Sequence, residues 1–156
     1  MRLDGNLIMN NLQANRKEDV LKQLGKRLYE FGYVKKDFTK AILEREKRLP
    51  TGLPTKPYGI AIPHTDSDKV IQPKLAFASL KKPVTFLQMG NAKKDVEVKL
   101  IFMMALTDAD DQLRMLQKMM GIFQNDKLVQ ALAQSRASCE IAYLIGLELG
   151  DNSLIK

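Results

Sequence analysis

The first third of the chain places apolar residues with the spacing of an amphipathic α-helix, in two successive stretches. Asn15, followed three residues later by Glu18, resembles a capping box, and Gly32 is a typical helix stop, so we expect the first helix between them. A second helix is expected over about residues 35–48. The apolar positions that define the two stripes are Val20, Leu21, Leu24, Leu28 and Phe31 in the first and Val34, Phe38, Ala41 and Ile42 in the second.

The middle of the chain changes to the patterns of β-strands. The apolar run 60–62 is short enough for a buried strand, and Pro63 ends it because proline has no N–H to give to a sheet. Residues 96–100 alternate between apolar and polar and then merge into the apolar run 101–106. This pattern is expected of a strand that is half exposed at its start and buried on both faces at its end. Further strands are predicted at 7–9, 75–80 and 84–87.

The last third returns to helical spacing. Asp110 or Asp111 is expected to cap a third helix, and Gln112 then lies in its first turn. The apolar stripe of this helix comprises Leu113, Leu116, Met120 and Phe123, and shorter helices are expected near 127–134 and 137–149. Helices that precede, separate and follow strands favour a layered α/β fold, and the length suits a single domain over residues 1–156.

The composition is that of an ordinary folded protein, with 45% hydrophobic and 28% charged residues, which argues against disorder. No apolar run approaches the length of a membrane span, and the first residues lack the layout of a signal peptide. The single cysteine excludes an intramolecular disulfide, and the eight methionines suit a reducing interior. We therefore expect a cytoplasmic location.

The net charge of +7 raises the question of a nucleic-acid partner. Binding by charge alone requires the basic residues to gather on one surface. Here they are spread along the chain and mixed with acids, as in residues 44–48. The pattern favours a solvated basic surface, which also steers acidic partners, over a nucleic-acid-binding domain.

The only histidine, His64, lies in the stretch PYGIAIPHTD at 57–66. It directly follows the predicted strand 60–62, and strand ends on a rigid sheet are favoured positions for chemistry. A metal site is a poor explanation because there is no second histidine, and a serine hydrolase would need a G-x-S-x-G motif that is absent. Three roles stay open: acid–base work with a carboxylate, attack on phosphorus by neutral imidazole, and a structural cap of a turn.

Four short motifs resemble those of one known family. They are Arg45-Glu46, Thr51-Gly52-Leu53, Gly59-Ile60-Ala61-Ile62-Pro63-His64 and Lys82-Pro83-Val84-Thr85-Phe86. From about residue 7 to residue 150, the chain is similar to the enzyme IIA component of the bacterial sugar phosphotransferase system (PTS), in the mannitol/fructose-type superfamily. The segments PTGL, PHTD and FLQMG most resemble the galactitol-type branch. The fold that this implies is a layered sandwich with a central mixed β-sheet flanked by α-helices.

The resemblance implies that His64 takes a phosphoryl group from the phosphocarrier protein HPr and passes it to a cysteine of enzyme IIB, with a membrane IIC component involved indirectly. It implies no metal, no organic cofactor, no nucleic acid and no direct membrane insertion. The alternative is a regulatory IIA-like protein that senses phosphorylation and controls a partner. Such modules often occur fused to other domains, for which 156 residues leave no room.

The resemblance also implies roles for residues around His64. It places a catalytic-site arginine in the Arg-Glu pair, at Arg45, with Arg48 as second choice because the connection to the histidine looks longer than in mannitol-type relatives. Guanidinium suits a phosphoryl group because it is always charged and offers forked donors. Gln112 stands where such relatives have a second active-site histidine, and an amide donates a hydrogen bond but carries no proton. Thr65 is expected either to bond the phosphoryl group or imidazole, or to cap a local turn.

The remaining candidates have structural expectations. Asp66 and Asp68 would repel a phosphoryl group, so we expect them to face solvent or shape their loop. Cys139 lies in an apolar helical context and is expected in the core. Core packing is also expected for the methionines, among them Met103, Met104, Met119 and Met120. Leu53, Ile60 and Leu113 form an apolar margin that could serve docking or belong to the core.

Overall fold

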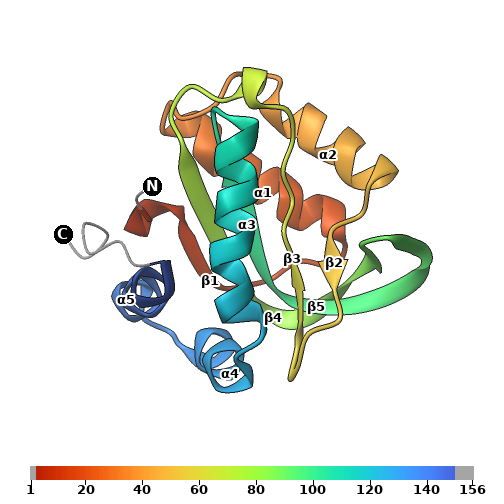
Figure 1. Cartoon of the computed structure of the whole chain (residues 1–156), viewed down its shortest axis with the longest axis vertical. Coiled ribbons are helices and arrows are strands. Elements are labelled where there is room, and N and C mark those ends of the chain that lie inside the picture. Colours follow the sequence, from red (N-terminus) through yellow and green to blue (C-terminus); the bar gives the residue numbers. More distant parts are fainter. Residues whose placement is uncertain (1–2, 150–156) are drawn as a thin grey trace.

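A computed structural model describes residues 3–149 of the chain (Figure 1). Its α-helices are α1 (Lys17–Glu30), α2 (Phe38–Arg48), α3 (Ala109–Phe123), α4 (Asp126–Gln134) and α5 (Ser138–Leu149). Its strands are β1 (Ile8–Leu12), β2 (Gly52–Leu53), β3 (Gly59–Ala61), β4 (Lys74–Gln88) and β5 (Asn91–Ala105). Short 3-10 turns cover Gly5–Leu7 and Ser67–Lys69. None of the helices in this described part is both long and apolar enough to cross a membrane.

The five strands form one mixed sheet. Its centre is the long antiparallel hairpin β4–β5, which turns at Gly90, where φ is +78°. A positive φ favours glycine because it has no Cβ. β1 adds to β4 in parallel, and β3 adds to β5 in parallel. The short β2 pairs antiparallel with β3 and touches the far end of β4. The parallel β3–β5 pair brings the ends of two strands to one edge of the sheet, where His64 lies.

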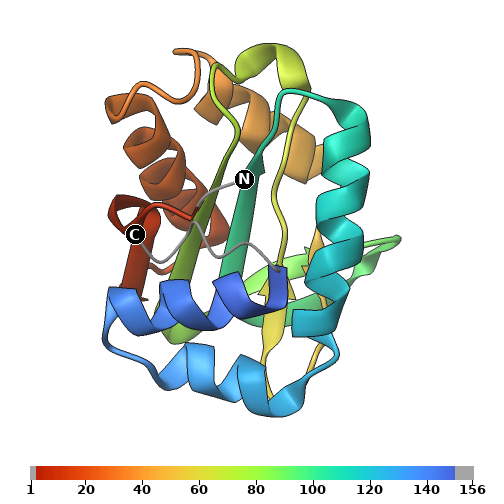
Figure 2. The same cartoon turned by 60° about the vertical axis from the view of Figure 1, so that its left-hand side comes forward.

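Helices cover both faces of this sheet, as Figure 2 shows. One apolar cluster joins one face to α1 and α2, and the other joins the opposite face to α3, α4 and α5. Successive residues of β5 alternate between them: Ile101 and Met103 belong to the first cluster, Phe102 and Met104 to the second. The prediction that this strand becomes buried on both faces is therefore confirmed, as is the layered sandwich with a central mixed sheet.

Several element boundaries differ from the predicted ones. The first strand is Ile8–Leu12 rather than 7–9, and the two strands predicted at 75–80 and 84–87 are one strand, β4. The pairing register of β4 shifts between Ser79 and Val84, so Pro83 falls in an irregularity of the ladder and deprives no regular pair of a donor.

Both predicted helix caps were wrong by a small shift. α1 begins after Arg16, whose N–H donates to the Asp19 carboxylate at 3.3 Å, one residue beyond the predicted Asn15 and Glu18. The Arg16 side chain has no acceptor, so this is one half of a capping box. α3 is capped by Asp108, which accepts a hydrogen bond from the N–H of Asp110 at 2.8 Å. For α3, the sequence offers three possible acidic caps, Asp108, Asp110 and Asp111, and the helix begins after the first of them.

The buried stripe of α3 was predicted wrongly in part, although Phe123 is buried as expected. Met115, Met119 and Ile122 face the core, whereas Leu113 and Met120 are exposed by 57% and 44%. The helix carries two apolar stripes at helical spacing, and its packing against the sheet chooses the one with two methionines. Of the predicted stripe, Leu113 and Met120 are exposed, whereas Leu116 is half-buried and packs against the core.

Two further residues expected to be buried are exposed. Cys139 lies in the first turn of α5, off the face that buries Ile141 and Ile145. Phe31 follows the last residue of α1 and stacks on Tyr33, with 6.3 Å between ring centroids.

Candidate functional site

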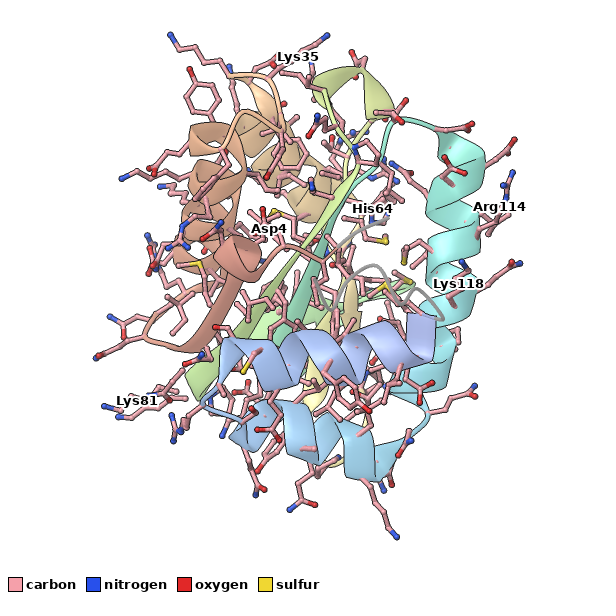
Figure 3. The ribbon with its side chains drawn as sticks, turned by 90° about the vertical axis from the view of Figure 1, so that its left-hand side faces the viewer. Asp4, Lys35, His64, Lys81, Arg114 and Lys118 are labelled. Atoms are coloured by element: carbon pink, nitrogen blue, oxygen red, sulfur yellow. The ribbon has the colours of Figure 1, made fainter. Side chains whose placement is uncertain are left out.

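His64 is held by backbone hydrogen bonds just beyond the end of β3. Beyond the last residue of β3, Pro63 accepts a hydrogen bond through its carbonyl from the N–H of Met104 at 3.0 Å, and His64 bridges to Met104 in parallel register. The imidazole is therefore carried by backbone that is bonded to the buried end of β5. Figure 3 shows His64 between the sheet and α3.

The ring of His64 is held in one tautomer. Its Nδ1 lies 2.9 Å from the carbonyl oxygen of Ile62. Because a carbonyl oxygen only accepts, Nδ1 carries the proton, and Nε2 keeps its lone pair. Burial lowers the pKa of His64, the Ile62 carbonyl opposes this, and the charge of Arg45 lowers the pKa further. The neutral, nucleophilic ring is thus the dominant form near neutral pH.

The half-buried imidazole lines a cleft of about 480 Å³. One wall comes from the end of α2 and the residues after it, and another from the turn of the β4–β5 hairpin. The remaining lining residues are Arg45, Arg48, Leu49, Pro50, Thr51, Met89, Gly90, Asn91, Ala92 and Leu116. An apolar wall with two guanidinium groups and one nucleophile fits an anionic group that arrives from outside.

Arg45 lines this cleft and carries an unused donor. Its Nε is buried and, across residues 3–149, has no hydrogen-bond partner. Its Nη1 lies 3.9 Å from Oδ1 of Asp66, a contact at the outer limit of an ion pair. Buried donors are normally bonded, so a partnerless one beside a nucleophile points to a ligand that supplies the acceptor. The second choice, Arg48, also lines the cleft but is exposed.

Gln112 and Thr65 are hydrogen-bonded to each other and do not line the cleft. The Gln112 side-chain amide donates to the backbone carbonyl of Thr65 at 3.0 Å, and Thr65 is buried. Neither residue lines the cleft of His64. Gln112 instead fastens the segment after the histidine to the first turn of α3. Asp66 and Asp68 are exposed, as expected.

One pair of residues was not assigned a role from the sequence. Glu46 and Thr51 are buried, and the Glu46 carboxylate accepts hydrogen bonds from both the N–H and the hydroxyl of Thr51. Both residues occur in motifs that carry the family resemblance, so a signal was present. Helical periodicity predicts that a glutamate such as Glu46 is a surface residue. Its burial could therefore be recognised only once the fold showed the two Thr51 donors.

The fold is shared with solved structures of IIA proteins. The mannitol IIA protein of Escherichia coli superimposes with a TM-score of 0.78 at 22% identity, over 93% of this chain and 99% of that one. Residues 1–146 match the family described as "Phosphoenolpyruvate-dependent sugar phosphotransferase system, EIIA 2". The chain belongs to this family of phosphotransferase components, which confirms the resemblance of its motifs.

Relatives in the family carry different roles. The galactitol-specific EIIA component of Escherichia coli K12 is 27% identical over 118 residues, which cover 74% of this chain and 77% of that protein. The transcriptional regulator ManR of Bacillus subtilis is 36% identical over 104 residues, which cover 67% of this chain. The matched part is only 14% of that regulator's length.

Proposed function

We propose that His64 accepts a phosphoryl group from the phosphocarrier HPr and passes it to a cysteine of an enzyme IIB during uptake of a sugar or polyol. The observation that carries this proposal is the cleft: a neutral imidazole whose Nε2 keeps its lone pair lines it together with Arg45, whose Nε has no hydrogen-bond partner within residues 3–149. Phosphoryl transfer asks for a positioned nucleophile and for positive charge around the moving oxygens, and the cleft offers both.

The proposed steps use this chain's own groups. The Nε2 lone pair attacks phosphorus in line as the N–P bond to the donor histidine breaks. Positive charge that develops on the His64 ring is stabilised by the Nδ1–H bond to the Ile62 carbonyl, while Arg45 stabilises the equatorial oxygens. In the second transfer, a cysteine thiolate of IIB attacks the same phosphorus. The N–P bond to His64 breaks, and its ring returns to the neutral tautomer.

Transfer between proteins requires a surface on which two partners dock in turn. Exposed apolar side chains lie around the cleft: Leu49 and Met89 line it, and Leu113 stands in the first turns of the neighbouring α3. Of the apolar margin expected from the sequence, Leu113 is exposed, but Leu53 is half-buried and Ile60 is completely buried in the core. We assign docking to Leu49, Met89 and Leu113 and a packing role to Ile60.

Similarity to the galactitol-specific component supports a galactitol-type polyol system for the proposed pathway. The cognate proteins in this proposal are HPr, a IIB component and, through IIB, a membrane IIC component, all acting at the cytoplasmic side. The role proposed for the chain uses no metal and no organic cofactor.

Reconstitution tests the proposal. The protein is incubated with phosphoenolpyruvate, enzyme I and HPr, and we expect one acid-labile phosphate per chain, because phosphohistidine is the expected product. A galactitol-type IIB is then added, and the phosphate should move to its cysteine. Absence of any label when HPr itself becomes phosphorylated would contradict the proposal.

The second candidate function is regulatory. The similarity to ManR favours it, since that relative is a transcriptional regulator. A phosphorylation sensor still takes the phosphate from HPr, but passes it to IIB slowly or not at all. The rate of the second transfer therefore separates a donor from a sensor.

The pH dependence of phosphate acceptance follows from the lowered pKa of His64. Only the neutral ring has a free lone pair, and protonation removes it. Because the pKa lies below its usual value near 6.5, acceptance should fall as the pH is lowered, and the midpoint of this fall should lie below pH 6.5. NMR titration of the single imidazole measures the midpoint directly, and a midpoint at or above 6.5 would be inconsistent with this environment.

Asp66→Asn is expected to favour the phosphorylated form. The Asp66 carboxylate lies 3.9 Å from Nη1 of Arg45 and competes with phosphoryl oxygens for that guanidinium. The pair is exposed on the Asp66 side, so we expect a modest gain of about two- to fivefold in phosphate acceptance. Asp68→Asn is the matched control, because Asp68 pairs with Lys69 instead. Equal rates in both variants would show that Asp66 does not compete.

A further inference from the structure

A buried carboxylate, that of Glu46, joins the end of α2 to Thr51, the residue directly before β2. Glu46 and Thr51 are each only 2% exposed. Oε1 of Glu46 accepts from the Thr51 N–H at 2.9 Å, and Oε2 accepts from the Thr51 hydroxyl at 2.8 Å. A carboxylate buried this deeply is costly unless it is hydrogen-bonded, so these contacts hold the two residues firmly together.

The contacts continue from Thr51 to the imidazole. The Thr51 carbonyl accepts a hydrogen bond from the N–H of Ile62 at 3.3 Å. The carbonyl of Ile62 in turn accepts from Nδ1–H of His64 at 2.9 Å. Glu46 also directly follows Arg45 on α2. One buried side chain is thus connected to both groups that face the phosphoryl group.

We propose that Glu46 and Thr51 act as positioning residues, which fix the ring of His64 and its placement relative to Arg45. This inference rests on the proposed function. Thr51 lines the cleft, but its hydroxyl donates to Glu46, and the His64 ring bonds to the Ile62 carbonyl instead. An apolar contact would fasten the same segments without fixing their orientation, whereas a carboxylate that takes both an N–H and an O–H sets direction as well as distance. We call the hydrogen-bonded pair Glu46 and Thr51 the clamp. Transfer rates are sensitive to misplacement of the reacting groups on the scale of 1 Å, so loosening the clamp should slow the reaction.

The ionisation of Glu46 is consistent with this arrangement. Burial raises the pKa of Glu46, and the two Thr51 donors oppose the effect, followed by the positive charges of Lys17 and Arg45. The donors that hold the carboxylate are thus also those that favour its charged form.

The test uses isosteric variants. Thr51→Val keeps the side-chain shape and the backbone N–H but removes the hydroxyl, Thr51→Ser restores a hydroxyl, and Glu46→Gln keeps acceptor oxygen while removing the charge. We expect the maximal rate of His64 phosphorylation by phospho-HPr to fall about tenfold in Thr51→Val, with the half-saturating HPr concentration unchanged. Thr51→Ser should recover most of the rate. The ¹⁵N spectrum of the single imidazole should show a reduced share of the Nδ1–H tautomer in Thr51→Val and Glu46→Gln.

Matched controls separate positioning from stability. Thr85→Val removes another threonine–glutamate hydrogen bond, that of the exposed Thr85 to Glu97 at 2.6 Å, outside the cleft. Glu44→Gln changes an exposed acid on the same helix. Both controls should keep the wild-type rate and ¹⁵N spectrum. If Thr51→Val is folded, less stable to denaturant and yet wild-type in rate and spectrum, the clamp serves stability alone and the inference is overturned.

The failure of the proposed function would be seen separately. Wild-type protein that takes no phosphate from HPr would refute phosphotransfer, whatever the clamp does. The ¹⁵N spectrum then decides the clamp by itself: an altered tautomer ratio in Thr51→Val supports positioning, and an unaltered ratio overturns it.

Discussion

Replacing His64 with alanine should abolish phosphorylation by phospho-HPr. The chain has no other histidine, so no second imidazole can take over the attack. The expected loss is to the background of the assay, at least about 10³-fold, because the covalent intermediate itself disappears. Incorporation of ³²P from labelled phosphoenolpyruvate, followed by acid treatment, measures it.

Two results would bear directly on this expectation. His64→Gln is the companion variant, since it keeps a planar polar group of similar length without a nucleophilic nitrogen, and it should be equally inactive. Persistence of acid-labile label in either variant would place the phosphate elsewhere and refute His64 as the acceptor. Circular dichroism confirms that each variant is folded before its rate is interpreted.

The second large effect is expected at Arg45. Arg45→Lys keeps the positive charge but loses the forked donors, including the buried Nε that has no partner within residues 3–149. Removal of one donor to a developing anion typically costs about 10²-fold in rate, and we expect a loss of this size in maximal transfer rate. Stopped-flow or quench kinetics with excess phospho-HPr give the rate.

Arg48→Lys is the matched control because Arg48 lines the same cleft but is exposed. We expect less than about a threefold change, consistent with the small contribution of solvent-exposed charges. A reversed order of the two effects would move the phosphate-stabilising role from Arg45 to Arg48.

The position of His64 could be predicted from the sequence because strong local rules define it. An apolar run, a proline and a following polar stretch place the residue near a strand end, and β3 does end at Ala61, two residues before Pro63 and one residue earlier than predicted. The same reasoning could not supply the tautomer, since that depends on which backbone carbonyl the ring reaches. Nor could it distinguish the roles of Arg45 and Arg48, which differ in burial and in partners rather than in residue type.

The errors in the prediction arose where two local solutions were nearly equivalent. α3 carries two apolar stripes, and only packing against the sheet selects Met115 and Met119 over Leu113 and Met120. Cys139 lies on a helix whose apolar residues are not confined to one face, so its exposure was not readable from periodicity. The hydrogen bonds of Glu46 depend on a loop that folds back onto α2, which no helical or strand pattern encodes.

The acceptor that orients the nucleophile is a main-chain atom, the carbonyl oxygen of Ile62. No exchange of side chain at position 62 can delete it, and Pro63 restricts the backbone that carries it. The orientation of the attacking nitrogen is therefore shielded from most single mutations, whereas the outward walls of the cleft are open to change. During evolution, mutations in those walls can therefore change which partner proteins dock, while the reacting imidazole stays correctly oriented.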